Sequence, residues 1–96
     1  MITHTVFFTL KHPSDSTEAN QFFDAARELA AIPGVQQFTC LKQISPKNKF
    51  DFGLSMVFDT QALYDQYTNH PDHTRFVAQY WTSNVADFME IDYQSF

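Results

Sequence analysis

The stretch Phe50-Asp51-Phe52-Gly53-Leu54-Ser55-Met56-Val57-Phe58-Asp59 decides the fold, because large apolar residues occupy every second position of it. This alternation is typical of a strand with one face on the core. The preceding residues 45–49, Ser-Pro-Lys-Asn-Lys, favour a turn and predict a hairpin with another strand over residues 35–44. We therefore expect these two segments to pair in an antiparallel sheet.

An amphipathic segment and a further strand precede this hairpin. Over residues 19–30, apolar side chains recur at helical spacing, which predicts a helix with one buried stripe. Pro33-Gly34 ends that helix. Before it, residues 3–10 alternate in polarity and are rich in β-branched and aromatic types, which predicts the first strand.

The sequence after the hairpin predicts a second helical region and then a last strand. Asp59 or Thr60 caps a predicted helix, which is interrupted at His70-Pro71 because the residue before a proline avoids the helical conformation. Helix then resumes, and a last strand is predicted near residues 86–93. The order β-α-β-β-α-β predicts an α+β, ferredoxin-like fold with an antiparallel four-stranded sheet and both helices on one face. We expect residues 1–96 to form a single domain.

The composition excludes several classes of partner. The chain has 6 Lys and Arg against 11 Asp and Glu, a formal net charge of −5, so it lacks the basic surface that nucleic acid requires. No run approaches the roughly 18 apolar residues of a membrane span, and the N-terminus lacks the pattern of a signal peptide. The single Cys40 excludes an internal disulfide and favours a reducing compartment, so we expect a cytoplasmic protein.

The sheet face turned away from the helices, the open sheet face, is poor in charge. Its predicted members are Thr3, Thr5, Phe7, Thr9, Gln37, Thr39, Leu41, Gly53, Ser55 and Val57. A solvated face normally carries Lys and Glu, whereas this composition suits burial against a second sheet. We therefore expect the chain to form a homodimer with itself through this face, with an open-faced monomer as the alternative.

Four segments of the chain carry a family resemblance. They are the first strand with His4, the turn at residues 32–35, the closing residues 91–93, and above all the stretch Tyr-x-x-His-Pro-x-His-x-x-Phe at residues 67–76. Together they resemble the stress-responsive dimeric α/β-barrel (Dabb) domain family, essentially end to end. The resemblance implies a ferredoxin-like protomer whose sheet joins its partner's to form a dimeric α/β barrel. The family includes plant stress proteins and plant polyketide cyclases.

The same resemblance implies an acid/base pair. In the cyclases a tyrosine and the second histidine of this stretch act together, and the matching positions here are Tyr67 and His73. His4 matches a third histidine of the pocket. An imidazole can abstract a proton next to a carbonyl, and a phenol can hydrogen-bond the enolate that forms. Structural roles, such as a buried tyrosine bonded to the backbone, are the alternative for all three.

A ligand would lie between the sheet and the helices. The side chains expected to line this space are Val6, Phe8, Phe22, Phe23, Phe38, Ile44, Phe76 and Trp81. They favour a small apolar or aromatic molecule. On the last strand, periodicity leaves open whether Glu90 and Asp92 face the helices or the opposite side of the sheet.

Nothing in the sequence predicts a metal or a cofactor. His70 and His73 have a metal-ligand spacing, but Pro71 breaks the helix that would align them. With two glycines the chain has no phosphate-binding loop, and Cys40 in mid-strand is typical of a small buried hydrophobe. We therefore expect no metal and no cofactor.

Three functions remain open at this point. The first is a small-molecule-binding protein of stress-response type, with a partly apolar ligand between sheet and helices. The second is a cofactor-free enzyme, like a polyketide cyclase, isomerase or monooxygenase, with Tyr67 and His73 as the acid/base pair. The third is a structural, oligomer-forming protein whose own rings fill the space. Whether those rings close the layer or leave a cavity distinguishes the first two functions from the third.

Overall fold

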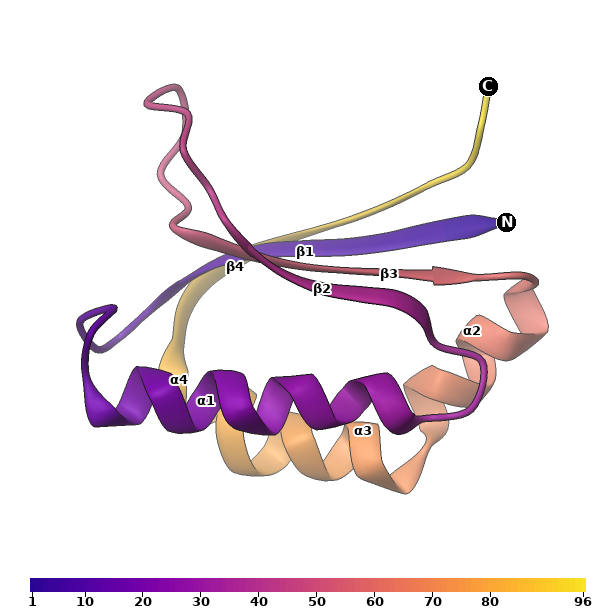
Figure 1. Cartoon of the computed structure of the whole chain (residues 1–96), viewed down its shortest axis with the longest axis horizontal. Coiled ribbons are helices and arrows are strands. Elements are labelled where there is room, and N and C mark those ends of the chain that lie inside the picture. Colours follow the sequence, from indigo (N-terminus) through magenta and orange to yellow (C-terminus); the bar gives the residue numbers. More distant parts are fainter.

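In the computed structural model, which describes residues 1–96, a four-stranded sheet carries the helices on one face (Figure 1). The first half contains β1 (Ile2–Leu10), α1 (Thr17–Arg27), a 3-10 turn (Glu28–Ala31), β2 (Gln36–Lys42) and β3 (Phe52–Phe58). The second half contains α2 (Gln61–Asn69), α3 (Pro71–Phe76), a π-helical turn (Val77–Trp81), α4 (Thr82–Asn84) and β4 (Val85–Tyr93). None of the helices has the length and apolar character that a bilayer span requires.

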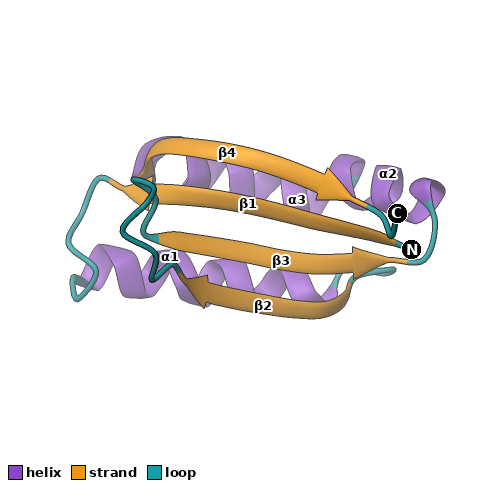
Figure 2. Ribbon diagram, turned by 90° about the horizontal axis from the view of Figure 1, so that it is seen from above, coloured by secondary structure: helices purple, strands orange, loops and turns teal.

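The strands lie in the order β2-β3-β1-β4, and every neighbouring pair is antiparallel (Figure 2). The predicted hairpin forms between β2 and β3, while β4 pairs with the far side of β1. This arrangement is the ferredoxin-like α+β fold, so the predicted fold class is confirmed. Both chain ends lie at the same end of the sheet (Figure 2).

Polar side chains determine where the helices begin. Ser16 and Thr60 cap α1 and α2 through their side-chain oxygens. His70 ends α2 because Pro71 follows it, and its Nδ1 accepts a hydrogen bond from the Asp72 backbone N–H at 3.1 Å. The break predicted at this point is therefore a change of helix, from α2 to α3.

Aromatic rings fill most of the layer between the sheet and the helices. Phe8, Phe22 and Phe58 are fully buried. The ring centroids of Phe8 and Phe22 lie 5.4 Å apart, and those of Phe22 and Phe76 lie 5.5 Å apart. Tilted contacts of this kind stabilise the core beyond the burial of apolar area. Much of the aromatic content of the chain, 17% of its residues, belongs to this layer.

The strand β2 is shorter than predicted. It ends at Lys42, after which the Gln43 side chain donates a hydrogen bond to the Phe50 carbonyl at 2.7 Å and holds the loop. Ile44 then projects from this loop and is 88% exposed. It does not line the space between sheet and helices, contrary to the prediction, because the alternation that suggested a longer strand continues past the last paired residue.

The pairing of β1 with β4 determines which side chains of β4 face the helices. His4 lies opposite Asp92. Glu90 lies opposite the buried Val6. Because residues directly opposite each other point to the same face of a sheet, both carboxylates are on the helix side. Three large side chains of β4 then belong to the open sheet face, where they are 41 to 52% exposed: Met89, Ile91 and Tyr93.

Candidate functional site

The aromatic layer does not close completely. A cavity of about 250 Å³ remains between the sheet and the helices, and ten of its 14 lining residues are hydrophobic. Its wall consists of His4, Val6, Leu29, Leu54, Met56, Tyr64, Tyr67, Thr68, His73, Phe76, Val77, Trp81, Phe88 and Glu90. Phe88 and the Glu90 side chain, both on the edge strand β4, are about half exposed, so the cavity opens beside this strand.

Six of the residues singled out in the sequence line this cavity. They are His4, Val6, Tyr67, His73, Phe76 and Trp81. The remaining aromatic candidates lie elsewhere in the layer: Phe8 and Phe22 are fully buried, while Phe23 and Phe38 pack against the core from its edge. Phe8 does not reach the cavity because its ring packs on Trp81, with centroids 5.2 Å apart.

Eight of the 14 wall residues were not predicted to line the cavity. Leu54 and Met56 alternate with outward-facing residues in β3, and that periodicity was a sufficient signal for them. Tyr64 lies one helical turn before Tyr67 in α2 and shares its buried face. Glu90 had no such signal, because both faces of β4 mix polar and apolar residues.

A π-helical turn forms one side of the cavity. The Thr82 N–H donates to the carbonyl of Val77, five residues earlier, and the Thr82 hydroxyl donates to the same oxygen at 3.0 Å. This wide turn begins with Val77 and ends with Trp81, and both side chains line the cavity. Such irregular turns within helices are frequent at functional sites.

His73 presents one ring nitrogen as an acceptor. Its Nδ1 lies 2.9 Å from the backbone carbonyl of Thr68, and because a carbonyl only accepts, Nδ1 carries the proton. In the neutral ring Nε2 then holds a free lone pair. Burial lowers the pKa of His73 from its ordinary value, which favours this neutral form. The side chain therefore has the state that a general base requires.

Tyr67 lies directly beside this imidazole. The centroids of the two rings are 4.5 Å apart. Tyr67 is 3% exposed, and its hydroxyl makes no hydrogen bond with another protein group, yet it is not sealed from the cavity that the side chain lines. Burial, and secondarily the charge of Glu90, raise the pKa of Tyr67, so the phenol stays protonated and can donate.

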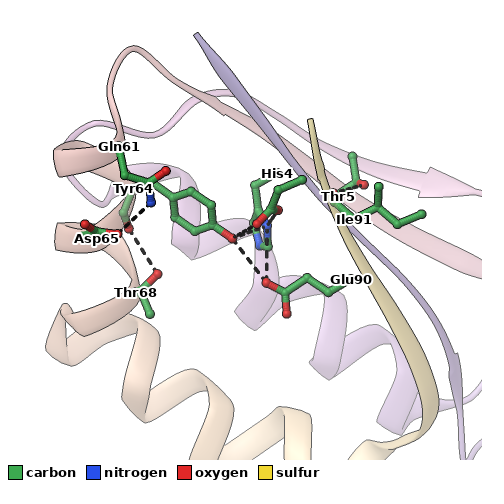
Figure 3. A network of polar contacts seen from close by, with 9 residues as sticks. His4, Thr5, Gln61, Tyr64, Asp65, Thr68, Glu90 and Ile91 are labelled. Atoms are coloured by element: carbon green, nitrogen blue, oxygen red, sulfur yellow. Dashed lines mark hydrogen bonds and ion pairs between the residues drawn. The ribbon is translucent and has the colours of Figure 1, made fainter. Parts of the chain in front are cut away.

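A second polar group joins β1, α2 and β4 at the same cavity (Figure 3). His4 Nδ1 lies 2.5 Å from Asp92 Oδ1. The Tyr64 hydroxyl lies 2.8 Å from the same nitrogen and 2.7 Å from Asp92 Oδ2. It also lies 3.2 Å from Glu90 Oε1. Burial and then the hydrogen bond to Asp92 raise the pKa of Tyr64, so its hydroxyl also stays protonated.

The ligand atoms of His4, Glu90 and Asp92 all lie within 4.8 Å of one another, a spacing that a metal ion can use. The 2.5 Å separation of His4 Nδ1 and Asp92 Oδ1, however, is that of a short charge-assisted hydrogen bond. A proton therefore occupies the position between them, and His4 and Asp92 are joined with Tyr64 in a hydrogen-bonded network. His70 takes no part, because its ring caps α3.

The family model described as the stress responsive A/B barrel domain matches residues 2–95. A Dabb family protein with a ferredoxin-like fold from Mesorhizobium loti is 51% identical, with 99% of this chain and 96% of that chain covered and a TM-score of 0.95. No curated protein sequence shows significant similarity to the chain.

Two more distant structures share the fold alone. A dimeric ferredoxin-like protein of unknown function from Thermobifida fusca is 22% identical, with 98% of this chain and 90% of that chain covered and a TM-score of 0.81. A hydroxynitrile lyase from Passiflora edulis is 15% identical, with 99% of this chain and 95% of that chain covered and a TM-score of 0.84.

The state of His73 can be measured directly. We expect its imidazole to titrate below the ordinary value of 6.5, because burial disfavours the charged ring. The unfolded chain then binds the proton more readily, so the free energy of unfolding decreases as the pH falls through 6.5. An NMR titration of the imidazole signal that disappears in His73→Asn provides the measurement. A pKa at or above the ordinary value would contradict the half-buried, neutral base.

Proposed function

This chain belongs to the family of stress responsive A/B barrel domains, and from that premise we propose that it is a dimeric protein that binds a small, partly apolar molecule in the cavity between sheet and helices. The single observation that carries the proposal is an incompletely filled, mainly apolar cavity lined by Tyr67, whose hydroxyl is open to it and has no protein partner. A protein with a purely structural role would be expected to close such a space with its own side chains.

The size of the cavity indicates the size of the ligand. An apolar cavity of about 150 Å³ already holds benzene. The cavity here measures about 250 Å³, so it has room for a single ring with a short substituent. Most drug-sized ligands need about 300 to 1,000 Å³ and would not be enclosed. The rings of Tyr67, Phe76 and Trp81 supply suitable contacts for a flat, apolar body.

The open sheet face supports the dimer. Leu41, Met89, Ile91 and Tyr93 are each between 38 and 52% exposed on or beside it, an apolar surface that a soluble monomer rarely presents. The Thermobifida fusca structure is described as dimeric, and we propose the same for this chain. The lone Cys40 supports a reducing, cytoplasmic compartment, and we treat residues 1–96 as one domain.

A second candidate function is acid/base catalysis on a carbonyl compound. The observation that favours it is the pairing of a free His73 Nε2 with the protonated Tyr67 hydroxyl at one cavity wall. The base would remove a proton next to the carbonyl, and the phenol would hydrogen-bond the developing oxyanion. Relatives of this fold include a hydroxynitrile lyase, so the fold hosts enzymes.

Ligand binding can be tested by filling the cavity. We expect benzyl alcohol to bind the wild-type protein and Val77→Phe to lose most of that binding, because the larger ring occupies the space. Val85→Phe is the matched control, since Val85 is a half-buried valine that does not line the cavity. Ligand-observed NMR or calorimetry measures the affinities. Equal binding to all three proteins would place the ligand outside the cavity and overturn the proposal.

Catalysis can be tested without knowing the natural substrate. We expect the protein to accelerate exchange of the α-protons of phenylacetone in D₂O, followed by proton NMR. His73→Asn should lower the enzyme-dependent rate by about 10² or more, because it removes the general base, and Tyr67→Phe should lower it as well. His12→Asn, at a surface histidine beside Glu18, should leave it unchanged. If the exchange rate with the wild-type protein equals the rate in buffer, the catalytic function is wrong and only the ligand-binding function stands.

The dimer can be tested by placing a charge on the open sheet face. We expect the wild-type protein to have twice the chain mass of 11.2 kDa in light scattering after size exclusion. Ile91→Glu should yield monomers, because it would bury an unpaired carboxylate at the interface. Ile44→Glu, in an exposed loop, is the control and should remain dimeric. A monomeric wild-type protein would contradict this part of the proposal.

A further inference from the structure

We propose that Glu90 makes the cavity selective for small molecules that carry a protonated amine, and that it rejects carboxylates of the same shape. This inference rests on the proposed ligand-binding function and names the chemical class of the ligand. It is argued from the charges on the cavity wall, from the count of protons in the polar network, and from the position of Glu90 at the opening.

The charges on the wall are of one sign. Among the 14 lining residues there is no Lys or Arg, and Glu90 is the only carboxylate. A second carboxylate, Asp92, does not line the cavity but accepts a hydrogen bond from the Tyr64 hydroxyl. The other titratable groups on the wall are two histidines and two protonated phenols. An anionic ligand would therefore meet a carboxylate with no Lys or Arg on the cavity wall to offset it.

The network has fewer protons than acceptors. Tyr64 has one hydroxyl proton, and Asp92 Oδ2, at 2.7 Å, is a closer acceptor for it than Glu90 Oε1, at 3.2 Å. The proton of His4 Nδ1 goes to Asp92 Oδ1 at 2.5 Å, while Glu90 Oε1 is 3.8 Å from that nitrogen, which is too far for a hydrogen bond. Asp92 thus receives both donors.

Glu90 is consequently the carboxylate with only a weak protein donor, the Tyr64 hydroxyl at 3.2 Å, which it shares with Asp92. It lies opposite Val6 on the edge strand β4, with its side chain half exposed at the opening of the cavity. A ligand that enters beside β4 passes this carboxylate. An ammonium group supplies both a stronger hydrogen bond and a positive charge opposite this carboxylate.

A second polar atom on the wall points to a ligand independently of the carboxylates. Tyr67 is 3% exposed, lines the same cavity, and its hydroxyl has no protein partner. The negative charge of Glu90 helps to raise the pKa of the Tyr67 phenol, and both side chains line the same cavity. With its apolar part against Leu54 and Met56, a ligand would have its polar end free to bind Glu90 and Tyr67.

The test uses three probes with one ring and different charge: benzylamine, benzyl alcohol and benzoate. For the wild-type protein at pH 7, we expect benzylamine to bind at least about tenfold more tightly than benzoate. In Glu90→Gln, which keeps the shape of the side chain, this preference should shrink about tenfold, with benzyl alcohol little changed. Glu28→Gln, at an exposed glutamate outside the cavity, should keep the wild-type preference.

The outcomes separate the two proposals. If benzyl alcohol binds in the cavity but benzoate binds as well as benzylamine, or Glu90→Gln leaves the preference unchanged, the role of Glu90 is wrong and the ligand-binding function stands. If none of the three probes binds the wild-type protein, the ligand-binding function fails and the role of Glu90 fails with it. A preference that Glu28→Gln also abolishes would be a general effect of net charge and would overturn the assignment to Glu90.

Discussion

The register between β1 and β4 is the constraint on which the rest of this structure depends. Side chains alternate between the two faces of a sheet, so a shift of one residue would exchange every side chain of β4 between the cavity and the open sheet face. With His4 opposite Asp92, the carboxylates of β4 meet the buried histidine, and Ile91 faces outward with its apolar neighbours. The opposite register would bury Ile91 beside His4 and place two carboxylates on the surface that we propose to be a dimer interface. One pairing thus supplies both a polar wall for the cavity and a charge-poor face for a partner.

The position of the cavity follows from where the large rings pack. At one end of the layer Phe8, Phe22 and Trp81 lie against one another, with centroid distances from 5.2 to 6.1 Å. At the other end Tyr64 stacks on Phe58, with the ring planes only 5° apart, and its hydroxyl is held by the His4 network. The Tyr64 ring therefore cannot turn into the space beside it without losing both the stacking and the hydrogen bonds. Aromatic side chains fill the layer at both ends and leave the middle open.

Local patterns were sufficient for the fold and for part of the site. The alternation over residues 50–59 and the helix breaks at Pro33 and Pro71 express backbone sterics and burial within one segment, so they can be interpreted without the rest of the chain. The same kind of pattern failed for Ile44, because alternation does not show where hydrogen bonding to the neighbouring strand ends. The pattern also failed for Glu90, because the face of the sheet on which this side chain lies is set by the pairing with β1, more than 80 residues earlier in the sequence. The family resemblance pointed to Tyr67, His73 and His4 as candidate site residues. The proton on His73 Nδ1 could not be predicted from the sequence, because its position depends on the contact with the Thr68 carbonyl in the folded chain.

The protonation states of the polar groups determine which of them can donate to a ligand and which can accept. Burial keeps the phenols of Tyr64 and Tyr67 protonated, and the nearby carboxylates act in the same direction. Tyr64 uses its proton within the network, whereas Tyr67 has no protein acceptor, so Tyr67 can donate to a ligand. His73 Nε2 can only accept while the ring is neutral. Toward a ligand, the Tyr67 hydroxyl can thus donate, His73 can accept as a neutral ring, and Glu90 can accept with a negative charge. A molecule with a carbonyl can use the first two, and a molecule with an amine can use the third. The same wall is therefore compatible with both the acid/base chemistry that we propose for Tyr67 with His73 and the selectivity that we assign to Glu90.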